Sequence, residues 1–105
     1  MTDFELCRDV AIKYFINCSV HTTRDKVYLS QERVDKDSRF YRLHEAYREY
    51  NGFDPINSNE MALDIAKSNK MIIDYENNSV KLGEMIEVDK KNINRAILKL
   101  FLRIE

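Results

Sequence analysis

The last fifteen residues, 91–105, carry more apolar side chains than one packing face of a helix can hold. Drawn as a helix, they form one apolar stripe of six residues: Ile93, Ala96, Ile97, Leu100, Phe101 and Ile104. Leu98 and Leu102 fall on the opposite side, among basic residues. A helix with one apolar stripe needs one neighbour, so this helix needs two, and either the rest of the domain or a second chain covers it. We therefore expect a two-sided contact that supports a homodimer, with Leu98 and Leu102 as interface residues.

Length and composition indicate one mostly helical domain spanning residues 1–105. Only two glycines and one proline occur, fewer than a sheet with many turns requires. Lys and Arg number 17 against 18 Asp and Glu, which excludes a chain-wide positive field for nucleic acid. No signal peptide and no apolar run of membrane-spanning length is present, so we expect a cytoplasmic protein without a membrane partner.

Apolar periodicity places four helices along the chain. The first covers residues 3–19, with Thr2 or Asp3 as its cap, and the second has its core at 38–50. A short apolar run at 27–29 is a candidate strand between them. The third helix starts at Asn57 or Ser58, and the last one at Asp89. The third helix is expected to bury Met61, Ala62, Ile65 and Ala66.

Between the third and fourth helices the apolar period changes from 3.6 to 2. Residues 71–76 and 79–86 flank Asn77 and Asn78, a pair that tolerates the positive φ of a two-residue hairpin turn. The turn implies three cross-strand pairs that match apolar with apolar and acid with base: Tyr75 with Val80, Asp74 with Lys81, and Ile73 with Leu82. We therefore predict one β-hairpin over residues 71–86.

The predicted fold class is mainly α with one β-hairpin (α+β), in the order α-(β)-α-α-β-β-α. A winged helix-turn-helix domain has this order, with the hairpin as its wing and an added C-terminal helix for dimerisation. The likeness is an analogy of element order, and fold alone does not decide function. The link between the second and third helices is also long for a helix-turn-helix unit.

Residue types for chemistry are present, but no complete set of catalytic or metal-binding roles is. The candidate ligands or nucleophiles are Cys7, Cys18, His21 and His44. Cys18 and His21 have plausible zinc spacing, yet a zinc site needs a second pair at similar spacing, which the chain lacks. Nucleophile elbows, phosphate loops and dinucleotide fingerprints are likewise missing. We predict no catalytic residues, no metal and no cofactor, and hence no enzyme.

Two surface clusters are candidate binding sites. Lys91, Arg95, Lys99 and Arg103 recur every four residues and are candidate nucleic-acid contacts, although a solvated helix face is the simpler interpretation. On the second helix, Tyr41 points away from the apolar stripe, with His44 and Arg48 beside it. Exposed Tyr and Arg are typical of protein interfaces, so Tyr41, His44 and Arg48 are candidate protein-interface residues. The alternative is a Tyr ring that lies on the Arg48 stem.

These observations favour a small non-enzymatic regulator or inhibitor that binds another protein. The abundance of Ile, Asn, Lys and Tyr is typical of AT-rich genes, including those of phages and mobile elements. The alternative is a winged-helix-like, DNA-binding transcriptional regulator that dimerises through its C-terminal helix. Glu60 and Asp64 on the outward side of the third helix disfavour that alternative, because carboxylates repel the phosphates they would face.

Overall fold

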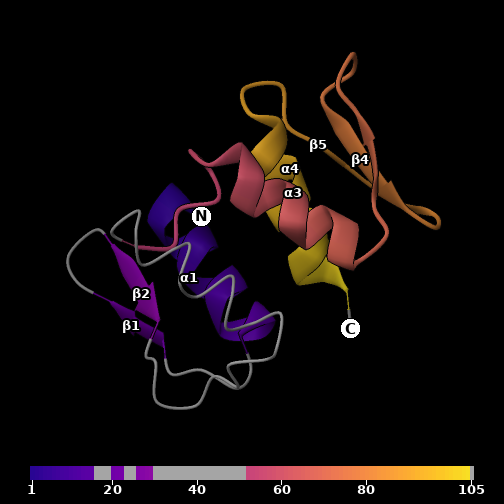
Figure 1. The fold of residues 1–105 in the computed structure, drawn as a ribbon. Helices are drawn as coiled ribbons and strands as arrows, with labels where there is room; N and C mark the ends of the chain where they lie inside the picture. The colour runs from indigo at the N-terminus through magenta and orange to yellow at the C-terminus, as the bar shows by residue number, and fades with distance from the viewer. Residues whose placement is uncertain (16–19, 23–25, 30–51, 105) are drawn as a thin grey trace. The chain divides into compact units, whose positions relative to one another are not determined.

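The structure is a computed structural model that describes residues 1–15, 20–22, 26–29 and 52–104 (Figure 1). The chain divides into two compact units, Thr2–Asp54 and Pro55–Glu105, with Met1 assigned to the second. The elements are α1 (Asp3–Tyr14), β1 (Val20–Thr22), β2 (Val27–Leu29), α3 (Asn59–Ser68), β3 (Ile72–Asp74), β4 (Ser79–Leu82), β5 (Met85–Val88) and α4 (Ile93–Arg103). The predicted α+β class and element order are confirmed for these elements, whereas the predicted helix at 38–50 lies outside the described residues.

The first unit begins with α1, whose start is fixed by a reciprocal cap. The Thr2 hydroxyl accepts a hydrogen bond from the Glu5 backbone N–H at 3.1 Å, and the Glu5 carboxylate accepts one from the Thr2 N–H at 3.1 Å. Thr2 is therefore the cap. The helix ends at Tyr14 rather than at residue 19, because Phe15 adopts a non-helical ψ of 62°. The Phe15 ring lies edge-on to Phe53, with the ring centres 5.4 Å apart.

A two-stranded antiparallel ribbon completes the described part of this unit. The apolar run at 27–29 is strand β2, as the sequence suggests, and it pairs with β1 in the register Val20–Leu29 and Thr22–Val27. Part of β1 lies in the polar stretch from residue 21 to 26, where the sequence pattern gives no strand signal. The Phe53 N–H donates to the Val27 carbonyl at 2.7 Å and so ties the end of this unit to β2.

The second unit begins with α3, which behaves as its sequence pattern predicts. Ser58 caps the helix by accepting a hydrogen bond from the Met61 N–H at 3.3 Å. All four residues predicted to be buried are buried: Met61, Ala62, Ile65 and Ala66. Lys70 then takes a positive φ of 57°, and the chain turns into β3.

The predicted hairpin is a three-stranded antiparallel sheet in the order β3–β4–β5. Residues 79–86 are not one strand, since Gly83 and Glu84 form a turn between the paired residues Leu82 and Met85. Gly83 has a φ of +61°, which is the conformation that a two-residue hairpin turn of the II′ type requires at its first position. The last two residues of the predicted strand, Met85 and Ile86, therefore belong to β5.

The predicted register of the first hairpin is wrong by two residues. Ile73 pairs with Val80 and Asp74 with Ser79, so four residues, 75–78, form the loop. The Asp74 carboxylate holds this loop by accepting hydrogen bonds from the backbone N–H groups of Glu76 and Asn77 at 3.1 and 3.3 Å. Asn78 does adopt the positive φ expected of it, 49°. A shift of two residues leaves each side chain on the face that the sequence predicted.

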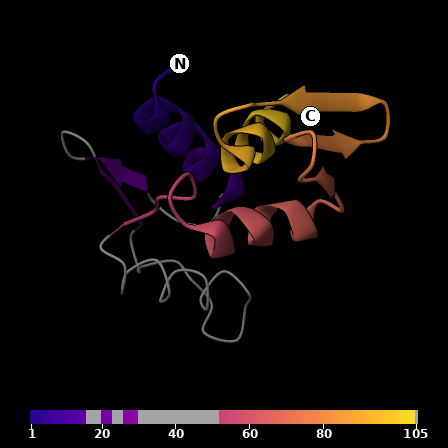
Figure 2. The ribbon, with the colours of Figure 1, turned by 90° about the horizontal axis from the view of Figure 1, so that it is seen from above.

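Helix α4 lies between α3 and the sheet in the second unit, in contact with α3 on one side and with β4 and β5 on another (Figure 2). It begins at Ile93, after the cap residue Asn92, and not at Asp89 as predicted. Among the described helices, none has the length and apolar character needed to cross a membrane.

Candidate functional site

The sheet of the second unit has an inner and an outer face, which the strand register separates. Residues paired directly across neighbouring strands share a face, so Ile73, Val80 and Glu87 lie on one side and Ile72, Lys81 and Ile86 on the other. Val80 is fully buried. Glu87 binds Arg103 of α4 at 2.7 Å, so its side of the sheet is the inner face that α4 covers.

The outer face presents aliphatic side chains to solvent. Ile72 is 68% exposed, Ile86 is 48% exposed, and Val88, two residues further along β5 and therefore on the same face, is 49% exposed. Lys81 lies on the central strand between Ile72 and Ile86 and is also exposed. We call these four residues, Ile72, Lys81, Ile86 and Val88, the outer sheet patch. Clustered exposed apolar side chains on one face are a feature of binding surfaces.

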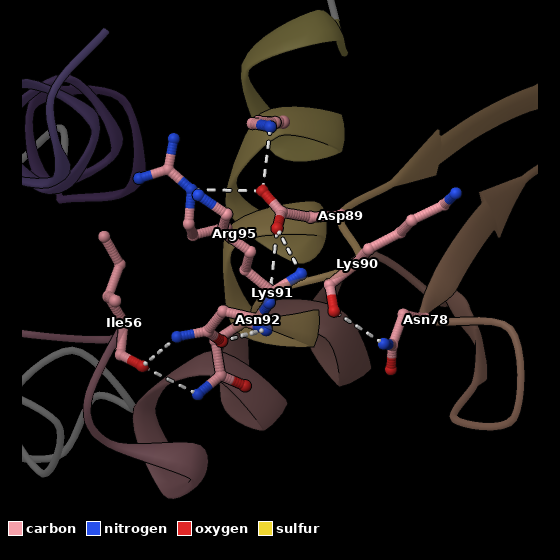
Figure 3. A network of polar contacts seen from close by, with 9 residues as sticks. Ile56, Asn78, Asp89, Lys90, Lys91, Asn92 and Arg95 are labelled. Carbon is pink, nitrogen blue, oxygen red and sulfur yellow. Dashed lines mark hydrogen bonds and ion pairs between the residues drawn. The ribbon is translucent and has the colours of Figure 1, made fainter.

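The connection from β5 to α4 is organised by the Asp89 carboxylate (Figure 3). One oxygen accepts hydrogen bonds from the backbone N–H groups of Lys91 and Asn92 at 3.0 and 3.2 Å. The other binds Arg95 Nε at 3.1 Å and Lys99 Nζ at 2.9 Å. Burial raises the pKa of Asp89, but the Lys99 hydrogen bond and the two backbone N–H donors outweigh it and hold that pKa below its usual value.

Two asparagines at the start of α4 join this connection to the segment before α3. The side-chain amides of Asn92 and Asn94 both donate to the Ile56 carbonyl, at 3.1 and 3.0 Å (Figure 3). Asn94, which is buried, also donates to the Asn59 side-chain oxygen at 2.9 Å. These polar contacts fix α4 against α3 and so hold the sheet that α4 supports in place.

The candidate nucleic-acid stripe on α4 is largely occupied by carboxylates of the same unit. Arg95 and Lys99 bind Asp89, and Arg103 binds both the Glu87 carboxylate and the Ile86 carbonyl. The Lys91 side chain is exposed. A phosphate backbone would have to compete with these ion pairs for three of the four basic groups.

The candidate protein-interface residues fall into two groups. Tyr41, His44 and Arg48 lie outside the described residues. Leu98 is fully buried and Leu102 half-buried, so Leu98 offers no surface to a second chain in this structure. The need of α4 for a second neighbour, which motivated the predicted homodimer, is met inside its own unit by α3 and the sheet.

The residues considered for metal binding or catalysis are not gathered in the described part of the chain. Cys7 is a buried cysteine on α1, with its Sγ 4.0 Å from the Asp54 Oδ1 atom. Cys18 and His44 fall outside the described residues. Within the ranges that the structure covers, no three His, Cys, Asp or Glu side chains form a group that would hold a metal ion.

The outer sheet patch was not among the residues singled out from sequence, although a signal for it exists. Gly83 followed by a non-glycine residue is a hairpin-turn pattern, and it splits 79–88 into two strands. With that split, Ile86 and Val88 alternate with Glu87 on an edge strand, which places them together on one face.

No family model, no curated protein and no solved structure matches the chain.

Proposed function

We propose that this protein is a small non-enzymatic regulator or inhibitor that acts in the cytoplasm by binding another protein. The outer sheet patch is the observation that carries the proposal. Its three aliphatic side chains, Ile72, Ile86 and Val88, are about half exposed or more, while the opposite face of the same sheet is covered by α4. The inner face supplies the core, so the apolar character of the outer face is available for a contact outside the unit.

A rough magnitude indicates what such a contact contributes. Full burial of an exposed Val or Ile side chain is worth about 1.5–3 kcal/mol, so three half-exposed side chains supply about 3 kcal/mol. A micromolar complex needs about 8 kcal/mol. The patch therefore increases affinity by about a hundredfold but requires further contacts around it. Tyr75, at the tip of the β3–β4 hairpin and 62% exposed, is a described residue suited to add one.

A winged-helix-like DNA-binding regulator is the second candidate, because a helix followed by a hairpin and a closing helix is present in the second unit. The ion pairs of Arg95, Lys99 and Arg103 count against it, since they already neutralise the basic stripe of α4. The chain also has a net charge of −1. We rank it below protein binding for these reasons.

Affinity capture with matched variants tests the proposal. The tagged full chain, an Ile72→Ser/Ile86→Ser variant and an Ile12→Ser control are used as baits in cells that express the protein, and captured proteins are quantified by mass spectrometry. Ile12 is an exposed isoleucine on α1, which belongs to the first unit and not to the unit that contains the sheet. We expect at least one protein to be retained by the wild type and the control but depleted tenfold or more with the double variant.

Identical capture by all three baits would contradict protein binding through the patch. The DNA-binding candidate is tested on the same proteins by retention on a DNA column over a range of salt. Retention that falls steeply with salt, and that is unaffected by the double variant, would favour DNA binding instead.

A further inference from the structure

We infer that the outer sheet patch recognises a carboxylate set among apolar side chains, so that the partner presents one Asp or Glu flanked by aliphatic or aromatic residues. The inference rests on the proposed function and adds the chemistry of the partner. It starts from the position of Lys81, the one charged side chain of the patch. Lys81 lies on the central strand, and its direct cross-strand neighbours are Ile72 on β3 and Ile86 on β5. Lys81 is therefore flanked on both neighbouring strands by an exposed isoleucine.

Lys81 differs from the basic side chains of α4 in having no carboxylate bound to it among the described residues. Arg95, Lys99 and Arg103 each bind a carboxylate at 2.7–3.1 Å. Asp74, on the neighbouring strand, is the acidic residue of the outer face that interacts electrostatically with Lys81, although no direct ion pair joins these two described residues. Asp74 is engaged by its own loop, where it accepts hydrogen bonds from two backbone N–H groups and from the Asn77 amide at 2.8 Å.

Charge complementarity follows from this difference. A partner that covers Ile72 and Ile86 also covers Lys81, and it removes water from the ammonium group. A carboxylate in the partner compensates that loss, whereas an entirely apolar partner covers the ammonium group without binding it. The surrounding surface of the partner must be apolar to match the isoleucines. An acidic residue with apolar neighbours three or four positions away along a helix presents this combination on one face.

The same geometry disfavours a second copy of this chain as the occupant. In a symmetric dimer formed by packing the patch on itself, the two-fold axis passes close to the patch centre. Lys81 occupies that centre, between Ile72 and Ile86, so the two ammonium groups would approach each other. Like charges brought together at an interface reduce affinity, and an acidic partner does not meet this penalty.

A displayed library of random 12-residue peptides tests the inference. The library is panned against the full wild-type chain, Lys81→Glu, Lys81→Gln, Ile72→Ser/Ile86→Ser and Lys67→Glu. Lys67 is an exposed lysine in the last turn of α3 and serves as the control for a change of charge outside the sheet. Circular dichroism and thermal unfolding establish that each variant is folded. If Lys81→Glu is not folded, Lys81→Gln alone serves as the variant without the positive charge.

We expect the wild type and Lys67→Glu to enrich peptides in which Asp or Glu adjoins apolar residues. Their affinity should fall at least tenfold on Lys81→Gln and further on Lys81→Glu, and the isoleucine double variant should lose them. The Lys81→Glu chain should instead enrich peptides with Lys or Arg among apolar residues. This exchange of peptide charge is the result specific to a carboxylate partner.

Three results would overturn the inference. One is a set of patch-dependent peptides that bind wild type and Lys81→Gln equally well, and another is the absence of peptides sensitive to the isoleucine variant. The third is a dimer in light scattering that dissociates in Ile72→Ser/Ile86→Ser, which would identify a second copy as the occupant. If affinity capture still finds a cellular protein that depends on the patch while the peptides ignore charge, the proposed function stands and only the carboxylate inference fails.

Discussion

Helix α4 and the β3–β5 sheet both carry apolar residues on two sides, but only the helix has both sides covered. In α4 the central part of the main stripe and Leu98 on its far side are buried, and the helix contacts α3 as well as β4 and β5. The sheet has one covered face, which contains Val80. Its other face leaves Ile72 and Ile86 in solvent.

This difference separates apolar surface that completes a core from apolar surface that is left for a partner. The excess on α4 is the stronger sequence signal, yet it is satisfied inside the chain. The excess on the sheet is weaker, with one residue on β3, two on β5 and none on β4, and has no cover in the described structure. An apolar residue pattern therefore gives the amount of surface to be buried, but the identity of the cover depends on the tertiary arrangement.

The largest effect should come from Leu98→Ala on α4. Because Leu98 is fully buried, we expect the variant to lower the free energy of unfolding by about 3 kcal/mol, as truncation of a packed leucine does. Urea unfolding measures this change. Ile12→Ala, at an exposed isoleucine of α1, is the control and should cost about 0.5 kcal/mol. If Leu98→Ala is as mild as the control, α4 does not have two covered sides and the comparison fails.

Asp89→Asn should have the next largest effect, because it removes the charge that joins β5 to α4. The amide still accepts the backbone hydrogen bonds, but Arg95 and Lys99 lose their carboxylate, and the Asp89 side chain is only 9% exposed. We expect a loss of about 2 kcal/mol at pH 7, in the range of hydrogen bonds to charged groups. A variant as stable as wild type would show that this ion-pair cluster does not hold the helix.

The pH dependence of the difference between wild type and Asp89→Asn follows from the lowered pKa of Asp89. A carboxyl group whose pKa is lower in the folded than in the unfolded state stabilises the fold at pH values above its ordinary pKa of 3.8. This contribution is lost as the pH falls through the pKa of the folded state. The difference in stability between wild type and Asp89→Asn should therefore be constant from pH 7 to about pH 5 and should shrink below pH 4. Urea titrations at several pH values measure it, and a difference that grows on acidification would contradict the assignment.

Asn94→Ala should lower stability by a smaller amount, about 1.5 kcal/mol, since it removes a buried hydrogen bond to the Ile56 carbonyl and a partly buried one to the Asn59 side chain. A double-mutant cycle with Asn59→Ala isolates the side-chain pair. We expect the two substitutions together to cost less than the sum of their separate effects. Strict additivity would indicate that the contact between the start of α3 and the start of α4 contributes nothing to stability.

The parts of the fold that were predictable from sequence are those decided by local chemistry. The caps at Thr2 and Ser58 need one side chain and one nearby backbone N–H, and the buried stripe of α3 follows from helical periodicity alone. The hairpin register was missed because Asp74 holds a four-residue loop in place of the expected two-residue turn. The turn at Gly83 was missed because residues 79–86 alternate well enough to pass as one strand.

The candidate site was less predictable, because each of its properties depends on residues distant in sequence. The sequence spacing places Arg103 in a basic stripe that faces solvent, whereas in the structure Arg103 binds Glu87 of β5. The exposure of Ile72 depends on its pairing with Lys81 and on α4 occupying the other face of the sheet. Tyr41, His44 and Arg48 remain predictions, as they lie outside the described residues.

The smallest effect on stability should come from the outer sheet patch itself. Ile72→Thr and Ile86→Thr keep a β-branched side chain that suits a strand, and each should change the free energy of unfolding by less than about 0.5 kcal/mol, because these positions are exposed. Val80→Thr, on the inner face of the same sheet, is the matched control. It buries a hydroxyl at a fully buried site and should cost about 2 kcal/mol.

Urea unfolding of the three threonine variants, at two protein concentrations, sharpens the comparison between the faces. Equal losses for Ile86→Thr and Val80→Thr would mean that the outer face is also packed. If the loss for Ile86→Thr also grew with protein concentration, a second copy of the chain would cover the outer face, because association stabilises the folded state by mass action. If the outer face binds a different protein, Ile86→Thr should have a mild effect on stability that does not depend on protein concentration. The same variant should also capture less of the partner.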